Sequence, residues 1–332
     1  MKLDKPPIPA RRALLASSLA LLAGSLPAQT VHNAWPARPL RILVGYPAGS
    51  SPDVQARMLA EPLSRALGQA VVVENKPGAG GNIGADALAK SQDGHTIAVI
   101  GNGPLTSSKY LYARLPYDPF KDFAPIALIG SAPLVWVVPK SSMPGSAQDY
   151  LQQARADGDK LAYGSVGAGS GGHLAMELIK DQLRLKAVHV PFNGGPPILN
   201  AMLGGQVHLT LLPASTVMPL VQSGKLAAVA VTSARRTPLA PELPSMEELG
   251  AKDINIEVWN AVMAPAGMPA AHQARLNSEL GKILSSREIR QKLFLQGWKD
   301  QDPSASALAR RIRSDAAVYG KLISSKGIKI DG

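Results

Sequence analysis

Five glycines, two serines and a histidine lie within one stretch of the 332-residue chain, residues 163–180, which reads YGSVGAGSGGHLAMELIK. Apolar residues at helical spacing follow His173, so the pattern predicts a strand, a glycine-rich turn and the start of a helix. Glycine lets the backbone approach a bound group closely, and free N–H groups at a helix start attract anions. With serine hydroxyls as further donors, the stretch suits a small anion. The alternative is a glycine-rich connection that binds nothing.

Two enzymatic interpretations of this loop fit less well. Gly167-x-Gly169-x-x-Gly172 matches the dinucleotide fingerprint, which also requires an acidic residue about 20 positions later, at the next strand end. The chain has VHVP there. Neither Ser165 nor Ser170 lies in the G-x-S-x-G context of serine hydrolases. A dinucleotide-dependent enzyme that uses the glycine loop is therefore kept only as an alternative from a different functional class.

Metal and thiol chemistry find little support in the sequence. The chain has no cysteine, which excludes disulfides, thiolate nucleophiles and cysteine-bound metals. Its six histidines show no i, i+4 pairing of the kind that binds zinc on a helix. We therefore expect no metal, no cofactor and no catalytic residue. The histidines are His32, His95, His173, His189, His208 and His272.

The composition is that of a soluble globular protein with a basic surface. Hydrophobic residues make up 45% of the chain and charged residues 18%, and the formal net charge is +11. The first 28 residues contribute four basic and one acidic residue, or +3, which leaves +8 on the remainder. An anionic partner suits this charge. The basic residues are scattered and are not interleaved with aromatics, so nucleic acid is not an expected partner.

The N-terminus has the layout of a secretory signal. Four basic residues among the first twelve precede an apolar run at 13–26, which is too short to span a membrane. We expect a signal peptide over residues 1–28, with cleavage near Ala28 and a mature protein in the periplasm. The adjacent Arg11 and Arg12 also allow twin-arginine export instead of the Sec route.

Strands and helices alternate along the first part of the chain. Buried strands are predicted at 39–46, 70–74 and 95–100, and each is followed by a polar or glycine-rich turn and a helix. This alternation is typical of a parallel sheet with helices on both faces. Ligands in such sheets bind outside the carboxyl ends of the strands, which is where all three turns fall.

A second α/β domain follows and returns to the first. Short apolar segments at 126–130 and 134–138 are predicted to cross into it, and a strand at 257–264 to cross back. The helices after residue 270 are then expected to cover the first domain. Two α/β domains with two crossings predict a hinged cleft that closes around a ligand. The predicted second-domain strands are 161–163, 187–190, 207–212 and 226–232.

Seven motifs in this order resemble the extracytoplasmic solute receptors of tripartite tricarboxylate transporters, the Bug or TctC family. The resemblance covers about residues 35–326. The motifs are Trp35-Pro36, VGYPAG with Asp53, VENKPGAGGNIGAD at 73–86, DGHTI at 93–97, the loop at 163–178, VPFNGGPPILNAMLGGQV at 190–207 and GKLAAVAVTSARR at 224–236.

The resemblance implies a two-lobed type II periplasmic binding protein, with residues 35–130 and 256–332 in one lobe and residues 131–255 in the other. It implies reversible capture of a small carboxylate: a di- or tricarboxylate, an acidic amino acid or an aromatic acid. Membrane transporter subunits are the implied protein partners, and we expect the mature receptor to be a monomer.

The resemblance also implies which turns hold the ligand across the cleft. The first turn supplies Tyr46, Pro47, Ala48, Gly49 and Asp53; the central loop supplies Gly164, Ser165, Gly167, Gly169, Ser170 and His173; and the VPFNGG turn supplies Phe192, Asn193, Gly194 and Gly195. Asn102, in the turn after the third strand, is added because that turn lies at the same sheet edge. None of these turns contains arginine, so backbone and hydroxyl donors are expected instead of a bidentate clamp.

Three positions depart from the family pattern. Ser50 stands where a second glycine is usual, His95 stands where an aromatic residue is frequent, and His208 replaces the aspartate that commonly follows GGQV. The aspartate suits the ammonium group of an amino acid, whereas a protonated histidine would suit a second carboxylate. We therefore expect a non-amino carboxylate as ligand, with an acidic amino acid as the alternative. His208 as an ordinary strand-start residue is equally open.

Overall fold

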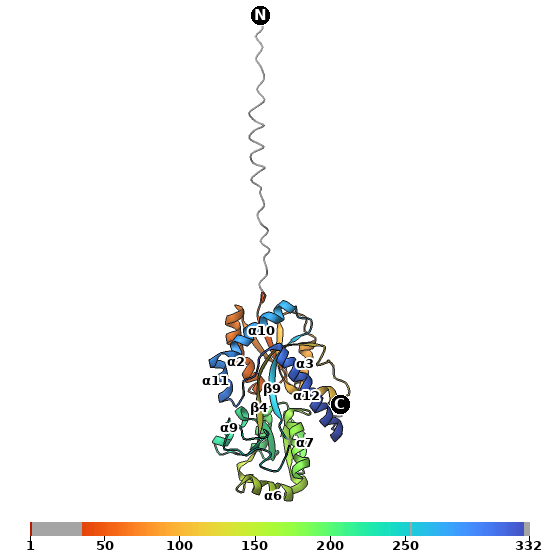
Figure 1. Cartoon of the computed structure of the whole chain (residues 1–332), viewed down its shortest axis with the longest axis vertical. Coiled ribbons are helices and arrows are strands. Elements are labelled where there is room, and N and C mark those ends of the chain that lie inside the picture. Colours follow the sequence, from red (N-terminus) through yellow and green to blue (C-terminus); the bar gives the residue numbers. More distant parts are fainter. Residues whose placement is uncertain (2–34, 239, 253, 329–332) are drawn as a thin grey trace. The chain divides into compact units, whose positions relative to one another are not determined.

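A computed structural model of the chain describes residues 35–238, 240–252 and 254–328, together with Met1. Contacts divide the chain into two units, Met1–Ala37 and Arg38–Gly332, and the helices and strands named below belong to the second unit (Figure 1). The predicted signal peptide and its cleavage site lie outside the described residues, Met1 excepted. Among the described residues, the structure contains no helix with the length and apolarity that a membrane span needs.

The first lobe begins with three parallel strands. β1 (Leu40–Val44) lies between β2 (Val71–Asn75) and β3 (Thr96–Gly101). Helix α2 (Ser51–Leu67) connects β1 to β2, and α3 (Asn82–Ala89) connects β2 to β3. This confirms the predicted alternation and brings the turns after β1, β2 and β3 to one edge of the sheet.

Two long strands cross between the lobes. β9 (Glu257–Pro265) runs antiparallel to β3 and to the first part of β4 (Phe123–Pro139). The second part of β4 pairs with the second lobe. β4 is one strand of 17 residues, so the prediction of two separate segments was wrong. Pro133, which suggested a break, is the last residue paired with β9, and Leu134 is the first paired with β7. A proline lacks an N–H to donate, and the change of partner strand tolerates it.

The second lobe has its own parallel strands. β5 (Ala162–Ser165) lies between β6 (Val188–Pro191) and β7 (Leu209–Pro213), while β8 (Leu226–Val231) runs antiparallel to β4. The nine strands form one continuous sheet because β4 belongs to both halves. Helices of this lobe are α6 (Ala147–Asp157), α7 (Gly171–Leu183), α8 (Gly195–Leu203) and α9 (Ala214–Gln222).

Each lobe is stabilised by its own hydrophobic clusters. Leu43 and Trp259 belong to the first-lobe cluster, together with Ile312 from the C-terminal part of the chain. In the second lobe, Trp136 and Val137 are neighbours on β4 but belong to two different clusters. Successive side chains of a strand point to opposite faces, so this sheet is covered by helices on both sides. These observations confirm a two-lobed α/β fold; the exact lobe boundaries stay a prediction.

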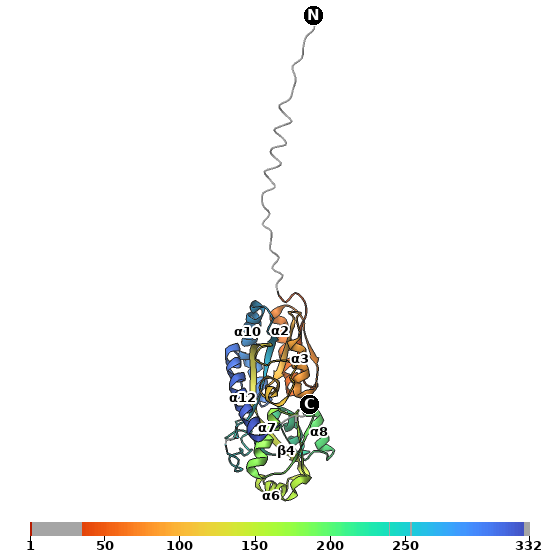
Figure 2. The same ribbon diagram turned by 90° about the vertical axis from the view of Figure 1, so that its right-hand side faces the viewer.

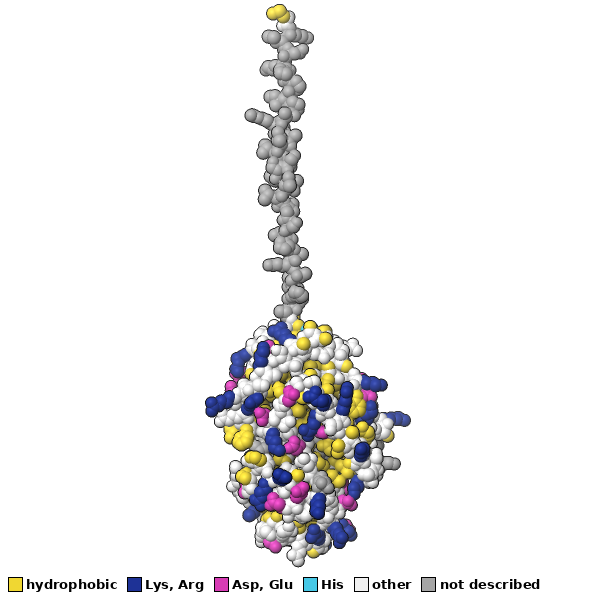
Figure 3. Space-filling model, in the orientation of Figure 1, with side chains coloured by type: hydrophobic (Ala, Val, Ile, Leu, Met, Phe, Trp, Pro, Cys, Tyr) yellow, Lys and Arg dark blue, Asp and Glu magenta, His cyan; other side chains and the backbone are white. Residues whose placement is uncertain are grey.

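The last three helices return to the first lobe, as predicted. They are α10 (Ala270–Ser285), α11 (Arg287–Leu295) and α12 (Ala305–Lys326), and α10 packs against α2 while α12 packs against β4. In Figures 1 and 2, α10 lies with α2 and α3, whereas α6 lies at the opposite end of the unit. Figure 3 shows lysine and arginine side chains spread over one face with acidic side chains between them, in agreement with the scattered charge of the sequence.

Candidate functional site

The turn between β1 and α2 is held in place by Asp53. Its carboxylate accepts hydrogen bonds from the Gly49 N–H and the Asn75 amide, both at 2.9 Å, and pairs with the Arg57 guanidinium. Burial pushes the pKa of Asp53 upward, but these donors outweigh it and hold the pKa below its ordinary value. The carboxylate of Asp53 thus stabilises the conformation of the turn.

Tyr46, at the start of this turn, contacts the next glycine-rich turn. Its hydroxyl donates a hydrogen bond to the Gly80 carbonyl at 2.7 Å. Gly81 has a φ of 99°, and a Cβ there would lie 2.9 Å from the tyrosine ring. Glycine is therefore required for the ring of Tyr46 to pack against this turn. Burial raises the pKa of Tyr46 well above its ordinary value, which keeps the hydroxyl protonated.

The central loop is braced by its own side chains. The Ser165 hydroxyl donates to the Gly167 carbonyl at 2.9 Å and lies 2.7 Å from Nε2 of His189, and Nδ1 of His173 accepts from the Gly169 N–H at 3.0 Å. Because the single Ser165 proton goes to Gly167, His189 must donate from Nε2. The serine hydroxyl expected to hold a ligand is therefore occupied within the loop.

The same loop rests on a stack of aromatic rings. The rings of His173 and His189 lie 4.0 Å apart, and the ring of Tyr163 lies 4.9 Å from that of His189. Burial lowers the pKa of His173 to about 4 and that of His189 to about 3. Both are therefore neutral at pH 7, and His173 acts as a hydrogen-bond acceptor for the loop instead of as a cation.

The central loop meets the turns of the first lobe at very short range. The Ser107 hydroxyl donates to the Gly169 carbonyl at 2.6 Å. A Cβ on Gly167 would lie 2.5 Å from Cα of Gly80, and one on Gly169 would lie 2.1 Å from Cδ1 of Leu111. The two glycines thus allow the central loop to approach the backbone at Gly80 and the side chain of Leu111 closely.

Close packing explains the glycines of the dinucleotide fingerprint without a bound dinucleotide. The third glycine of the fingerprint, Gly172, lies against β7, where a Cβ would be 2.9 Å from the Leu211 carbonyl oxygen. All three glycines of the fingerprint therefore meet other parts of the protein.

The VPFNGG turn faces the turn after β1. Gly194 has a φ of 125°, and a Cβ on it would lie 2.8 Å from Cδ of Pro47. The Phe192 N–H donates to the Ser165 carbonyl at 2.9 Å, which ties this turn to the central loop, and Asn193 is exposed. The start of α8 at Gly195 thus faces the start of α2.

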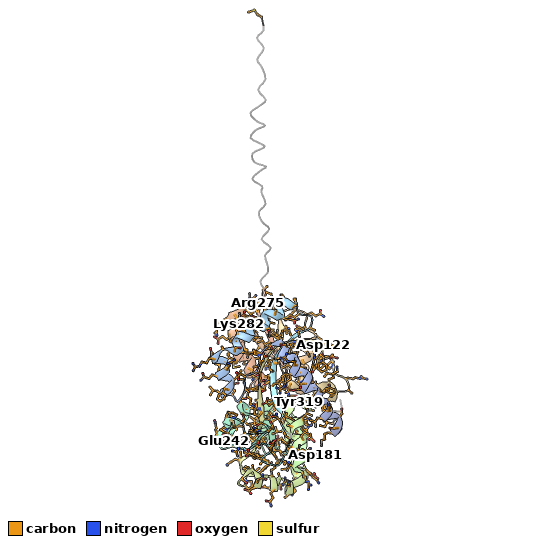
Figure 4. The ribbon with its side chains drawn as sticks, viewed as in Figure 1. Asp122, Asp181, Glu242, Arg275, Lys282 and Tyr319 are labelled. Carbon is orange, nitrogen blue, oxygen red and sulfur yellow. The ribbon has the colours of Figure 1, made fainter. Side chains whose placement is uncertain are left out.

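Asn102 lies at the same boundary between the lobes. Its amide nitrogen is 3.4 Å from the position of a Cβ on Gly171 and donates, at 3.4 Å, to the hydroxyl of Tyr319 on α12. Figure 4 places Tyr319 between Asp122 and Asp181 along the long axis of the unit. The structure thus brings the predicted turns and Asn102 together.

His208 is not brought to this site. Its Nδ1 accepts a hydrogen bond at 2.9 Å from the N–H of Ala162, the first residue of β5. The central loop follows Ser165 at the other end of that strand, about 10 Å away at the usual rise per residue. The structure gives no support to the expected contact between His208 and a ligand, because parallel strands bind ligands at their carboxyl ends.

The sequence interpretation missed a buried amide pair, Gln55 and Asn260. The Asn260 side chain donates to Oε1 of Gln55 at 2.9 Å, and both residues are buried. An asparagine in the middle of the apolar strand EVWNAVMA was a usable signal, because buried amides require partners. Gln55 carried no comparable signal within its helix.

Both the sequence and the fold are similar to those of known proteins. The sequence profile described as "Tripartite tricarboxylate transporter family receptor" matches residues 55–328. The chain is 34% identical to "Protein BugT" of Bordetella pertussis over 290 residues, which cover 86% of this chain and 88% of BugT.

Solved structures agree with the sequence comparison. A structure of the periplasmic binding protein BugD is 30% identical with a TM-score of 0.84, and the match covers 89% of this chain and all of BugD. R. palustris Rpa4515, solved with adipate, is 32% identical with a TM-score of 0.85 over 89% of this chain and all of that protein. MatC of Rhodopseudomonas palustris, solved with malate, is 27% identical with a TM-score of 0.81 over 87% of this chain and all of MatC.

These relatives are binding proteins, so the dinucleotide-dependent enzyme is wrong as an alternative. The family profile spans most of the chain, and the two lobes are those that the motifs implied. The chain therefore belongs to the tripartite tricarboxylate transporter receptors, the TctC or Bug family of solute-binding proteins.

Proposed function

We propose that this protein is an extracytoplasmic receptor that captures a small carboxylate between its lobes and releases it without chemical change. The observation that carries this proposal is the facing of helix starts: α2 meets α8 through Pro47 and Gly194, and the loop before α7 meets Gly80 and Ser107. The first N–H groups of a helix have no partner within the helix, and they attract anions. A carboxylate between these helix starts would receive donors from both lobes.

We further propose a non-amino dicarboxylate as the ligand class. Relatives were solved with adipate and with malate, which are dicarboxylates without an amino group. An amino-acid ligand would need an acceptor for its ammonium group, and the carboxylate of Asp53 already serves Gly49, Asn75 and Arg57. An acidic amino acid is the second candidate, because the family resemblance also implies such ligands.

The expected affinity follows from hydrogen bonds to charged groups, each of which contributes roughly 1.5–3 kcal/mol. A few such bonds, less the cost of closing the lobes, correspond to about −8 kcal/mol, or a Kd near 1 μM. We propose membrane transporter subunits as partners of the closed, monomeric receptor, which would reach the periplasm after removal of residues 1–28.

A ligand screen tests the proposal. The purified protein is titrated with adipate, succinate, malate, citrate, benzoate, glutamate and aspartate, first by thermal shift and then by calorimetry. A ligand at 100 times its Kd adds about 2.7 kcal/mol of stability, which is readily detected. Binding of a dicarboxylate without an amino group supports the proposal, binding of glutamate or aspartate alone favours the second candidate, and no response to any acid refutes both.

A further inference from the structure

The amide pair Gln55–Asn260 contains one polar group that the protein does not use. Asn260 on β9 donates to Oε1 of Gln55 on α2, while Nε2 of Gln55 is fully buried and has no hydrogen-bond partner among the described residues. Exchanging the oxygen and nitrogen of both amides reverses the bond but again leaves one NH2 group unused. A buried donor without an acceptor is unfavourable, so this amide is suited to an acceptor brought from outside the chain.

The pair lies where the sheet presents its ligand-binding edge. Asn260 pairs with Gly101, the last residue of β3. A Cβ on Gly101 would lie 3.4 Å from both Oδ1 of Asn260 and the hydroxyl of Tyr46, so the absence of a side chain keeps space open between them. Gln55 is in the second turn of α2, and helical side chains lean toward the N-terminus, which here is the turn after β1.

Two neighbouring groups at this edge are already engaged, whereas Nδ2 of Asn82, at the start of α3, is also buried without a hydrogen-bond partner in the described part of the chain. The Tyr46 hydroxyl donates to Gly80, and the carboxylate of Asp53 faces Gly49 and Arg57. Of Tyr46, Asp53 and Gln55, only Gln55 retains an unused donor.

We propose that Gln55, oriented by Asn260, is a specificity-determining residue that donates from Nε2 to the far end of the ligand, such as the second carboxylate of a linear dicarboxylate. This inference rests on the proposed function. It makes the receptor select acids with an acceptor at both ends, because a ligand with an apolar end would leave the buried donor unmatched.

Two substitutions at Gln55 separate this role from a structural one. Gln55→Glu keeps an acceptor for Asn260 and nearly the same shape, but replaces the donor with a carboxylate oxygen. Gln55→Met removes both functions. Gln273→Met is the matched control, because Gln273 on α10 donates from Nε2 to the Met268 carbonyl at 2.6 Å, within its own segment of the chain.

The measurement compares the Kd of adipate with that of hexanoate, and that of succinate with butyrate, by calorimetry or competition at pH 8. The wild type and Gln273→Met should bind the diacid at least about tenfold more tightly than its monoacid. Both Gln55 variants should lose at least about tenfold in affinity for the diacid and less than about threefold for the monoacid. Lowering the pH to 5 should restore diacid binding to Gln55→Glu, whose protonated form donates again, and not to Gln55→Met.

Equal losses for diacid and monoacid, or no loss, would overturn the role of Gln55 while leaving the receptor function intact. If Gln55→Met does not fold, Gln55→Glu and its recovery at low pH decide the question. A wild-type protein that binds no dicarboxylate would instead refute the proposed function, and this inference with it.

Discussion

His173 illustrates how one side chain can fix a glycine-rich loop through a single hydrogen bond to its backbone. Its Nδ1 accepts a hydrogen bond from the Gly169 N–H, which requires the neutral ring. The backbone N–H of His173 donates to the Ser170 hydroxyl at 3.3 Å. A proton on Nδ1 would place two donors, the ring N–H and the Gly169 N–H, against each other. Because burial keeps the pKa of His173 near 4, the loop retains this bond through the neutral pH range.

Acid should therefore destabilise the protein through the stacked histidines. In the unfolded chain, histidines take up protons below their ordinary pKa of about 6.5. In the folded protein, His173 and His189 stay neutral until the pH falls to about 4 and about 3, respectively. Their contribution to the free energy of unfolding is complete above pH 6.5 and is lost as the pH falls. Each histidine loses roughly 1.4 kcal/mol for each unit by which folding lowers its pKa. Urea unfolding between pH 7.5 and 4.5 measures this loss.

His173→Asn is the control for that experiment, because its amide oxygen can accept the Gly169 N–H and does not titrate. A variant whose stability falls with pH as steeply as the wild type would show that His173 contributes nothing to the loss.

At the scale of elements, closure depends on glycines in facing turns. A Cβ on Gly167 would come within 2.5 Å of Cα of Gly80. Gly167→Ala should therefore lower ligand affinity at least about tenfold, because the lobes could not approach fully. Gly205, which also has positive φ but open space around it, provides the control: Gly205→Ala should cost about 1–2 kcal/mol of stability and leave affinity unchanged. Calorimetry of both variants distinguishes obstruction of closure from backbone strain.

The hydrogen bond from Ser107 to Gly169 should retain the closed state. Ser107→Ala removes a bond of about 0.5–1.5 kcal/mol between the lobes, so ligand should dissociate roughly 2- to 12-fold faster. Stopped-flow displacement with tryptophan fluorescence gives the rate. Ser223→Ala, in which an exposed serine loses a bond to the Leu220 carbonyl of its own turn, should leave the rate unchanged. Equal rates in all three proteins would contradict a role for Ser107 in holding the lobes together.

At the scale of the whole molecule, the crossing strands are tied by a third segment. Ser131 on β4 exchanges backbone hydrogen bonds with Lys299, and the Lys299 ammonium lies 2.8 Å from the Glu257 carboxylate on β9. Lys299→Met should destabilise the protein by about 1–3 kcal/mol, because a half-buried carboxylate loses its partner. Denaturation midpoints should show part of this loss recovered in Glu257→Gln/Lys299→Met. A double variant no more stable than the single one would contradict the pairing.

Periodicity and turn residues were sufficient to predict the alternating strands, both crossings and the turns at the strand ends, since burial and glycine usage leave local signals. What they could not predict is the direction of individual side chains. The structure turns Asp53, Ser165 and His173 inward to support their own turns, and it places His208 at the opposite strand end. Gln55 and Asn260 meet only through a tertiary contact 205 residues apart, which no local pattern encodes.

The contact between Gly80 and Gly167 limits how closely the two lobes can approach each other. Two main-chain segments that already touch cannot be brought closer by changing any side chain, so the distance between the lobes at this point is set by the path of the backbone. Substitutions elsewhere between the lobes could then change ligand preference without changing this distance. Relatives that preserve this backbone contact would share the same distance between the lobes even where their preferred ligands differ.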